Sequence, residues 1–116
     1  MPSLITFGAE LIRINFSKNR IEYSTSRGIS WVSRYSGSSC GVFKDLVEYE
    51  GVLYACTDKG VYYSTSKGIS WVCRSSTSAA KTFVSIQNGG RELLATTADG
   101  HLYYSTSKGI SWVRRH

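Results

Sequence analysis

The sequence YSTSRGISWV at residues 23–32 occurs again as YSTSKGISWV at residues 63–72 and at residues 104–113. The three copies differ at one position only, which is arginine in the first copy and lysine in the other two. The tryptophans of successive copies are separated by 40 and then by 41 residues. A fixed period of this size predicts a chain built from repeated structural units.

The segments between the copies indicate β-strands. Apolar and polar residues alternate in VLYACT at residues 52–57 and in ELLATT at residues 92–97, and β-branched and aromatic residues dominate. This pattern excludes helical repeats of similar length. Turn residues separate the segments, such as EG at residues 50–51 and NGG at residues 88–90. Each period therefore predicts four short antiparallel strands, the pattern of a β-propeller blade.

The whole chain is expected to be one all-β repeat domain of three β-propeller blades. The blades cover approximately residues 1–36, 37–76 and 77–116. The expected strands are residues 3–7, 10–16, 20–24 and 30–35, then 42–49, 52–57, 61–64 and 70–74, then 81–87, 92–97, 101–105 and 111–115.

The octet STSRGISW at residues 24–31 resembles the Asp-box, or BNR repeat, found in the propellers of sialidases and sortilin-like receptors. The usual form of that motif is Ser-x-Asp-x-Gly-x-Thr-Trp, and its serine, glycine and tryptophan positions match in all three copies. Two positions depart from it. Ser26, Ser66 and Ser107 stand where the family has aspartate, and serine also replaces the frequent threonine before the tryptophan.

The resemblance implies that each octet forms the hairpin turn between the third and fourth strands of a blade, away from the ligand face. Glycine permits a positive φ, and a serine hydroxyl can accept hydrogen bonds from turn amides as the aspartate does. The tryptophan buries its ring and offers its N–H to a carbonyl. The residues expected to act in this structural repeat are Ser24, Ser26, Gly28, Trp31, Ser64, Ser66, Gly68, Trp71, Ser105, Ser107, Gly109 and Trp112.

Ring closure is the second consequence of a propeller. Propellers typically close with 4 to 8 blades, and a three-bladed arc would leave two apolar blade faces in water. We therefore expect a homodimer that closes a six-bladed ring, with a fragment of a longer propeller as the alternative. The start at Met1 and the end just after the last strand favour a complete set of blades.

The net charge of +6 favours anionic partners without identifying one. Nucleic acid is not an expected partner, because the basic residues are scattered rather than gathered with aromatic residues. Arg34, Arg74 and Arg115 each follow an octet tryptophan by three residues, on the opposite strand face. They either pair with neighbouring carboxylates or form a basic fringe for an acidic glycan or an acidic protein.

The ligand face of such a propeller is expected on the loops at residues 36–41 and 75–80 and on the shorter loops at residues 17–19, 58–59 and 99–101. These loops are rich in serine, threonine and glycine. Asp58, Asp99 and His101 are candidate ligand-binding residues there. Paired carboxylates can hydrolyse glycosides, but aspartate in such turns usually bonds the local backbone.

Catalytic machinery cannot be traced in the sequence. The Phe-Arg-Ile-Pro type motif of sialidases is absent, as are a Ser-His-Asp set, a glycine-rich phosphate loop and a cluster of metal ligands. His101 and His116 are expected as exposed side chains rather than as a metal pair. The sequence therefore predicts a non-catalytic binding or interaction module without a cofactor. The alternatives are a carbohydrate-binding, lectin-like propeller and, after it, a sialidase-like glycoside hydrolase.

The three cysteines, Cys40, Cys56 and Cys73, are odd in number and lack zinc-like spacing, so they are expected as free thiols in a reducing compartment. No apolar run approaches the ~20 residues that cross a bilayer, and the first residues do not form a signal peptide. The expectation is a soluble, cytoplasmic protein.

Overall fold

A computed structural model describes residues 4–36 and 39–115. Its described residues form twelve β-strands and one short 3₁₀ turn. The strands are β1 (Leu4–Phe7), β2 (Glu10–Asn15), β3 (Arg20–Ser24), β4 (Val32–Ser36), β5 (Phe43–Tyr49), β6 (Val52–Thr57), β7 (Gly60–Ser64), β8 (Val72–Ser75), β9 (Phe83–Asn88), β10 (Leu93–Thr97), β11 (Leu102–Ser105) and β12 (Val113–Arg114), and the turn is η1 (Ala80–Thr82).

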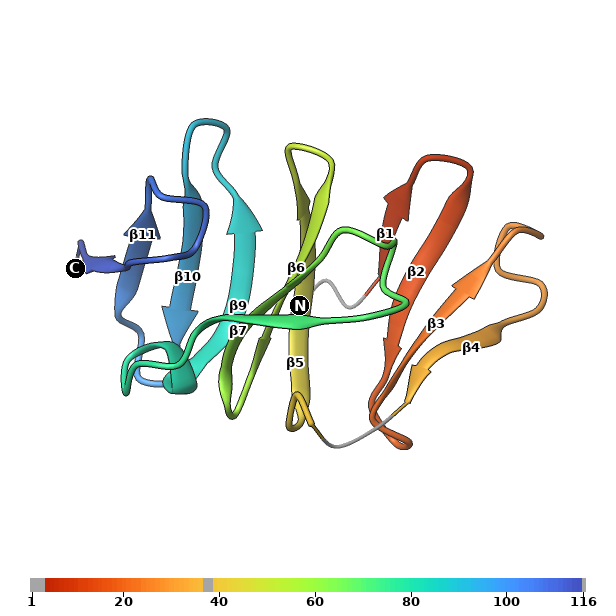
Figure 1. Ribbon diagram of the computed structural model, residues 1–116, viewed down its shortest axis with the longest axis horizontal. Coiled ribbons are helices and arrows are strands. Elements are labelled where there is room, and N and C mark those ends of the chain that lie inside the picture. Colours follow the sequence, from red (N-terminus) through yellow and green to blue (C-terminus); the bar gives the residue numbers. More distant parts are fainter. Residues whose placement is uncertain (1–3, 37–38, 116) are drawn as a thin grey trace.

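The strands make three separate four-stranded antiparallel sheets. Each sheet contains four consecutive strands in sequence order, β1 to β4, β5 to β8 and β9 to β12. The three sheets stand next to one another with the β5–β8 sheet in the middle (Figure 1). This arrangement confirms the prediction of an all-β chain with blade-like sheets. No helix in the described residues is long and apolar enough to cross a membrane.

The hydrophobic core consists of two layers between neighbouring sheets. The layer between the first and second sheets contains Ile12, Ile14 and Ile21 facing Phe43, Leu46, Leu53 and Ala55, with Cys40 at its edge. The layer between the second and third sheets contains Tyr49, Tyr54, Cys56 and Val61 facing Ala80, Phe83, Ile86, Leu93 and Ala95. The middle sheet is therefore covered on both faces, whereas each end sheet is covered on one.

One charged residue is buried where the second and third sheets meet. Asp45 in β5 is fully buried, and its two carboxylate oxygens accept hydrogen bonds from the backbone N–H groups of Leu46, at 2.9 Å, and Ile86, at 3.0 Å. The second bond joins β5 to β9. Burial raises the pKa of Asp45 to about 6, although both backbone bonds act to lower it.

The fourth strand of each sheet begins later than the sequence predicts. The prediction started these strands at Ser30, Ser70 and Ser111, but they begin at Val32, Val72 and Val113. The reason lies in the turn, where the backbone N–H of each of these serines donates to a serine hydroxyl instead of to the neighbouring strand. The tryptophan that follows is likewise outside the strand.

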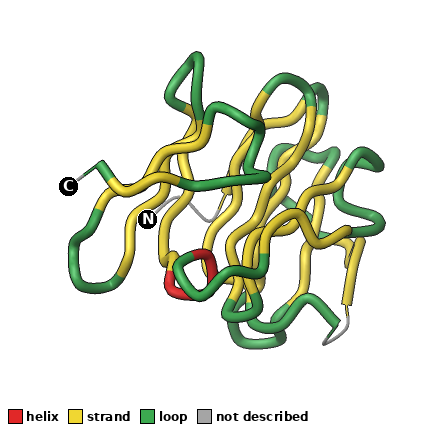
Figure 2. The backbone as a smooth tube through the Cα atoms, turned by 60° about the vertical axis from the view of Figure 1, so that its left-hand side comes forward, coloured by secondary structure: helices red, strands yellow, loops and turns green. Residues whose placement is uncertain are grey.

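The first strand of the third sheet is also shorter than predicted, because residues 81 and 82 belong to η1 (Figure 2). Thr77 precedes this turn and is bonded to it. Its hydroxyl accepts a hydrogen bond from the N–H of Ala80, at 3.2 Å, and its carbonyl accepts one from the N–H of Lys81, at 3.1 Å. The predicted strand residue His101 lies in a turn as well, and its N–H donates to Thr97 Oγ1.

Parts of three sequence predictions lie outside the described residues. These are the strand start at Ser3, residues 37 and 38 of the expected ligand-face loop, and the exposed side chain of His116.

Candidate functional site

The three octets form nearly identical turns between the third and fourth strands. In the first copy, Ser24 Oγ accepts hydrogen bonds from the N–H groups of Gly28, at 2.9 Å, and Ser26, at 3.2 Å. Ser64 and Ser105 accept the same pair of bonds in the second and third copies. These first serines are buried, so each turn has a buried hydroxyl at its centre.

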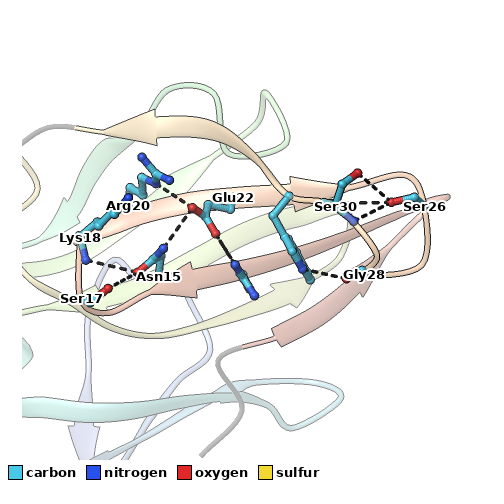
Figure 3. A network of polar contacts seen from close by, with 10 residues as sticks. Asn15, Ser17, Lys18, Arg20, Glu22, Ser26, Gly28 and Ser30 are labelled. Atoms are coloured by element: carbon cyan, nitrogen blue, oxygen red, sulfur yellow. Dashed lines mark hydrogen bonds and ion pairs between the residues drawn. The ribbon is translucent and has the colours of Figure 1, made fainter.

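The second serine of each octet accepts a backbone hydrogen bond inside the turn. Ser26 Oγ accepts a hydrogen bond from the N–H of Ser30 at 3.0 Å, and the indole N–H of Trp31 donates to the Gly28 carbonyl at 3.1 Å (Figure 3). The other two copies repeat both bonds within 0.1 Å. The octet residues therefore use their polar groups within the turn and hold it closed.

One feature of the octet turn was not foreseen from sequence. The residue before each octet glycine also has a positive φ, with values of 60° for Arg27, 61° for Lys67 and 58° for Lys108. Long side chains rarely adopt this left-handed conformation. The hydrogen bonds that the first two octet serines accept from nearby backbone amides hold the residue in this conformation.

Ser66 gives a direct test of the octet turn. Ser66→Ala removes the acceptor of the Ser70 N–H, and we expect the free energy of unfolding to fall by about 0.5 to 2 kcal/mol, as for other side-chain caps of backbone amides. Ser66→Asp keeps an acceptor and should be neutral or stabilising. Urea unfolding measures both. The exposed Thr65, changed to alanine, is the matched control and should stay within about 0.5 kcal/mol of the parent. Unchanged stability in both Ser66 variants would contradict the assigned role.

The three arginines that follow the tryptophans lie in three different blades. Arg34 binds both carboxylate oxygens of Glu10, at 2.7 and 3.0 Å, and Arg115 binds those of Glu92, at 2.8 and 3.1 Å. These hydrogen bonds hold the pKa of Glu10 and of Glu92 below the usual range. Two of the three guanidiniums therefore have a carboxylate partner.

Arg74 differs from the other two because Val52 stands where the first and third blades have glutamate. Its guanidinium carbon lies 3.8 Å from the centroid of the Tyr63 ring, and its Nε is buried without a hydrogen-bond partner. Arg34 and Arg115 make the same stacking contact, with Tyr23 at 3.7 Å and with Tyr104 at 4.0 Å. In all three blades the guanidinium of the arginine thus lies over a tyrosine ring.

An ionic network around a buried glutamate distinguishes the first blade. Glu22 in β3 is 2% exposed and accepts hydrogen bonds from Arg13 at 2.9 Å, Arg20 at 2.7 Å and Asn15 at 3.1 Å (Figure 3). Burial acts to raise the pKa of Glu22, but these bonds lower it to about 2. Arg13 also stacks on the Trp31 ring, with its guanidinium carbon 4.1 Å from the ring centroid. Sequence reasoning missed this network, which lies on the outer side of the first sheet.

A cleft of about 510 Å³ opens at the end of the third sheet opposite to the octet turns. The connection from β8 through η1 forms one wall, and the turn from β10 to β11 forms the other. The lining residues are Ser78, Ala79, Thr82, Thr97, Ala98, Asp99, His101 and Tyr103. Two of the loops expected to build the ligand face thus meet around one cleft, and they bring Asp99 and His101 together.

The polar groups of the cleft contact one another. His101 Nε2 lies 3.4 Å from Asp99 Oδ2, and the two side chains are 37% and 72% exposed. Asp99 Oδ1 accepts a hydrogen bond from Thr97 Oγ1, which lowers the pKa of the Asp99 carboxyl. Tyr103 was not foreseen as a lining residue. The strand predicted over residues 101–105 places it on the same face as His101, and this signal could have identified it, although β11 itself begins only at Leu102.

Asp58 does not have the same surroundings as Asp99, although the two occupy similar turns. Asp58 Oδ1 accepts a hydrogen bond from the N–H of Val42 at 2.8 Å, and Asn19 bonds the carbonyl of Gly41 and the N–H of Phe43. Both side chains hold the connection between the first and second blades. Asp58 therefore has a structural contact, and of the two candidate carboxylates only Asp99 is among the described residues that line the cleft.

The cysteines are free thiols, as the sequence predicts, with Cys40 and Cys56 buried and Cys73 exposed. Burial raises the pKa of the Cys56 thiol to about 12, which keeps it protonated at neutral pH. Within the described ranges, histidine, cysteine, aspartate and glutamate do not gather in a group of three that could hold a metal ion.

The comparisons with known proteins add no identification to this geometry. No protein-family model matches the chain, and no curated protein matches its sequence.

Proposed function

We propose that the chain is a non-catalytic binding module, an Asp-box-like β-propeller in which two copies contribute three blades each to a six-bladed ring. Three four-stranded sheets packed face to face, each with an octet between its third and fourth strands, support the propeller. Apolar side chains left in water on the end sheets support ring closure. Leu4 on the first sheet is 49% exposed, whereas the corresponding Leu46 and Ile86 are buried.

The observation that carries a binding function is the cleft of the third blade. Ser78 and Thr82 offer hydroxyl groups, Asp99 offers an acceptor, and His101 and Tyr103 offer ring surfaces. Such a mixture of a few polar groups around a concave surface is typical of small-ligand sites. Bonds of this kind orient a ligand without transferring a group to it.

A glycoside hydrolase is disfavoured by the same lining. Glycosidases of the common mechanisms place two carboxylic groups on either side of the scissile bond, about 5 to 9.5 Å apart. The cleft has one carboxylate, that of Asp99, because Asp58 belongs to another blade and contacts Val42. A sialidase would further need three arginines around the carboxylate of its substrate, and arginine is not among the lining residues.

A neutral glycan is the ligand class that this lining favours. Sugar hydroxyls donate to a carboxylate and accept from hydroxyl and imidazole groups, and a tyrosine ring can pack on the apolar face of a sugar. The basic fringe has less support, because Glu10 and Glu92 already neutralise Arg34 and Arg115. Of the ligands considered for the binding module, a neutral glycan thus has more support than an acidic protein, as in the lectin-like alternative.

A glycan array tests this proposal with two matched variants. We expect Asp99→Asn to weaken binding of neutral glycans about tenfold or more, because a charged hydrogen bond contributes about 1.5 to 3 kcal/mol. Glu50→Gln also removes one exposed carboxylate, but in the turn between β5 and β6, and should bind like the parent. Binding should change little between about 0.05 and 0.5 M salt.

Two results would contradict the proposal. Cleavage of fluorogenic glycosides by the parent chain, lost in Asp99→Asn, would make the protein an enzyme. Binding restricted to sulfated or sialylated glycans and abolished by salt would move the site from the cleft to the arginines.

A further inference from the structure

Inside the chain, the arginine of each blade covers the octet turn of the next blade. Arg34 of the first blade donates a hydrogen bond to the carbonyl of Lys67 at 3.0 Å, across the interface between the first two sheets. A methyl group added at Gly68 would lie 3.7 Å from Cδ of Arg34. At the next interface, a methyl group at Gly109 would lie 3.4 Å from Cγ of Arg74. The packing of the arginine on the octet glycine therefore recurs at both internal interfaces, and the hydrogen bond to the octet carbonyl is made at the first of them.

The octet of the first blade has the same shape, but among the described residues no arginine of another blade lies over its glycine. Arg13, which stacks on Trp31, belongs to the same blade. A methyl group at Gly28 would meet only Trp31 and Leu11 of its own blade, at 3.7 and 3.8 Å. Gly68 and Gly109 are buried, whereas Gly28 is half-buried. A cleft of about 310 Å³ lies beside it, and its lining includes Glu10, Leu11, Ser24, Thr25 and Arg27.

On the outer face of the first sheet, one leucine is more exposed than its counterparts at the two internal interfaces. Leu53 and Leu93 lie against the octet glycines of the second and third blades, and both are fully buried. Leu11 has the equivalent place in the first blade and is half-buried. The first sheet thus presents half of an interface that the chain completes twice elsewhere.

The third blade presents the other half. Arg115 binds Glu92 and stacks on Tyr104 just as Arg34 binds Glu10 and stacks on Tyr23, so its guanidinium is already oriented. The side chain of Arg115 is 39% exposed, compared with 9% for Arg34 beneath the next blade.

The apolar residues beside this arginine are similarly uncovered. Leu102 is half-buried, whereas Ile21 and Val61, at the same position in the first two blades, are fully buried. The outer face of the third sheet is therefore a second incomplete interface, complementary to the one on the first sheet.

We infer that Arg115 of one copy occupies the cleft beside Leu11 of a second copy and donates a hydrogen bond to the carbonyl of Arg27. This contact rests on the ring proposed above and names how its two copies join. The interface is heterologous, third blade to first blade, so it forms twice in a closed dimer. Two copies give six blades, within the usual range of 4 to 8, whereas three copies would give nine.

Both outer faces also have more polar residues than the internal interfaces. Arg13 of the first sheet replaces the alanines at positions 55 and 95, and Thr96 of the third sheet replaces Ile14 and Cys56. A surface that is in water before assembly tolerates such residues, as interfaces between separate chains commonly do. The same residues would suit the capped ends of an open arc, and the mass of the particle decides between the two.

The test uses light scattering after gel filtration with one variant on each half of the interface. We expect the parent chain to have twice the mass of 12.9 kDa at micromolar concentration. Arg115→Ala removes the inserted side chain, and Thr25→Trp fills the cleft from an exposed position. Each should weaken dimerisation about tenfold or more. Arg91→Ala, at another exposed arginine, is the charge-matched control and should dimerise like the parent. Circular dichroism checks that each variant is folded.

Mixing the two variants adds a test of the head-to-tail geometry. Each variant alone has both interfaces damaged, but a mixed pair has one interface in which neither partner is changed. We therefore expect the mixture of Arg115→Ala and Thr25→Trp to recover dimers that neither variant forms alone. A dimer joined first sheet to first sheet, or third sheet to third sheet, would instead be weakened by only one of the two variants.

The outcomes separate this contact from the ring itself. A parent chain that is monomeric at all concentrations overturns both. A dimer that neither variant weakens overturns the Arg115 contact and leaves the ring. Assemblies larger than two copies that both variants dissociate support the contact and overturn the six-bladed ring.

Discussion

Gly60→Ala should destabilise the chain by more than about 4 kcal/mol or prevent it from folding. Gly60 begins β7 with a φ of 130°, where its backbone crosses close to the end of β8. A Cβ atom there would lie 2.1 Å from the carbonyl oxygen of Ser75 and 3.1 Å from Cα of Ser76. These are backbone atoms, so the clash can be relieved only by separating β8 from β7.

Gly100 provides a matched control for this substitution. Its φ of 92° is also positive, but a Cβ atom there would have no other atom within 4 Å. Gly100→Ala should therefore lower the free energy of unfolding by only about 1 to 2 kcal/mol, the cost of holding alanine at a positive φ. Urea unfolding of the two variants and the parent measures the difference. Equal losses at the two positions would show that β8 can shift to accept a side chain.

Asp45 should make the protein less stable as the pH rises from about 4 to about 6. Its pKa is raised from 3.8 to about 6 in the folded chain, so the folded state binds the proton more tightly than the unfolded state does. The contribution of Asp45 to the free energy of unfolding is fully present below pH 4 and is lost as the pH rises through 6. A shift of this size corresponds to about 3 kcal/mol.

Comparison with Asp45→Asn isolates this effect from other titrating groups. Glu22 has the opposite dependence, because its pKa of about 2 makes its contribution disappear as the pH falls below 4.5. The asparagine variant keeps Glu22 but cannot titrate at position 45. We expect the stability of the parent relative to Asp45→Asn to fall by about 3 kcal/mol between pH 4 and pH 7. Unfolding curves at four pH values measure it, and a constant or rising difference would refute the assignment.

The sequence was most informative where the structure depends on contacts between residues that are close in sequence. The octets fix their own turns through bonds between residues three and four apart, so the serine, glycine and tryptophan positions could be interpreted directly. Their period then gave the number of sheets. The late start of the fourth strands was missed for the same local reason, because the Ser30 N–H bonds the Ser26 hydroxyl.

The remaining features depend on register and on packing between sheets. Arg34 meets Glu10 only because β2 and β4 lie on either side of β3, and Asp45 meets Ile86 only because β5 packs on β9. Pairs separated by 24 and 41 residues have no local signal. The loops around the cleft could be predicted from the blade pattern, but its lining by Thr82 and Tyr103 required η1 and the strand face to be known.

The order of strands within each sheet also bears on how the chain folds. Every pairing joins strands adjacent in sequence, and none passes from one sheet to another. The loops to be closed are therefore short, so the entropy of closing them is small and contact order is low for an all-β protein. During synthesis, each sheet can form as soon as its own period of about 40 residues has left the ribosome. It does not have to wait for the C-terminus.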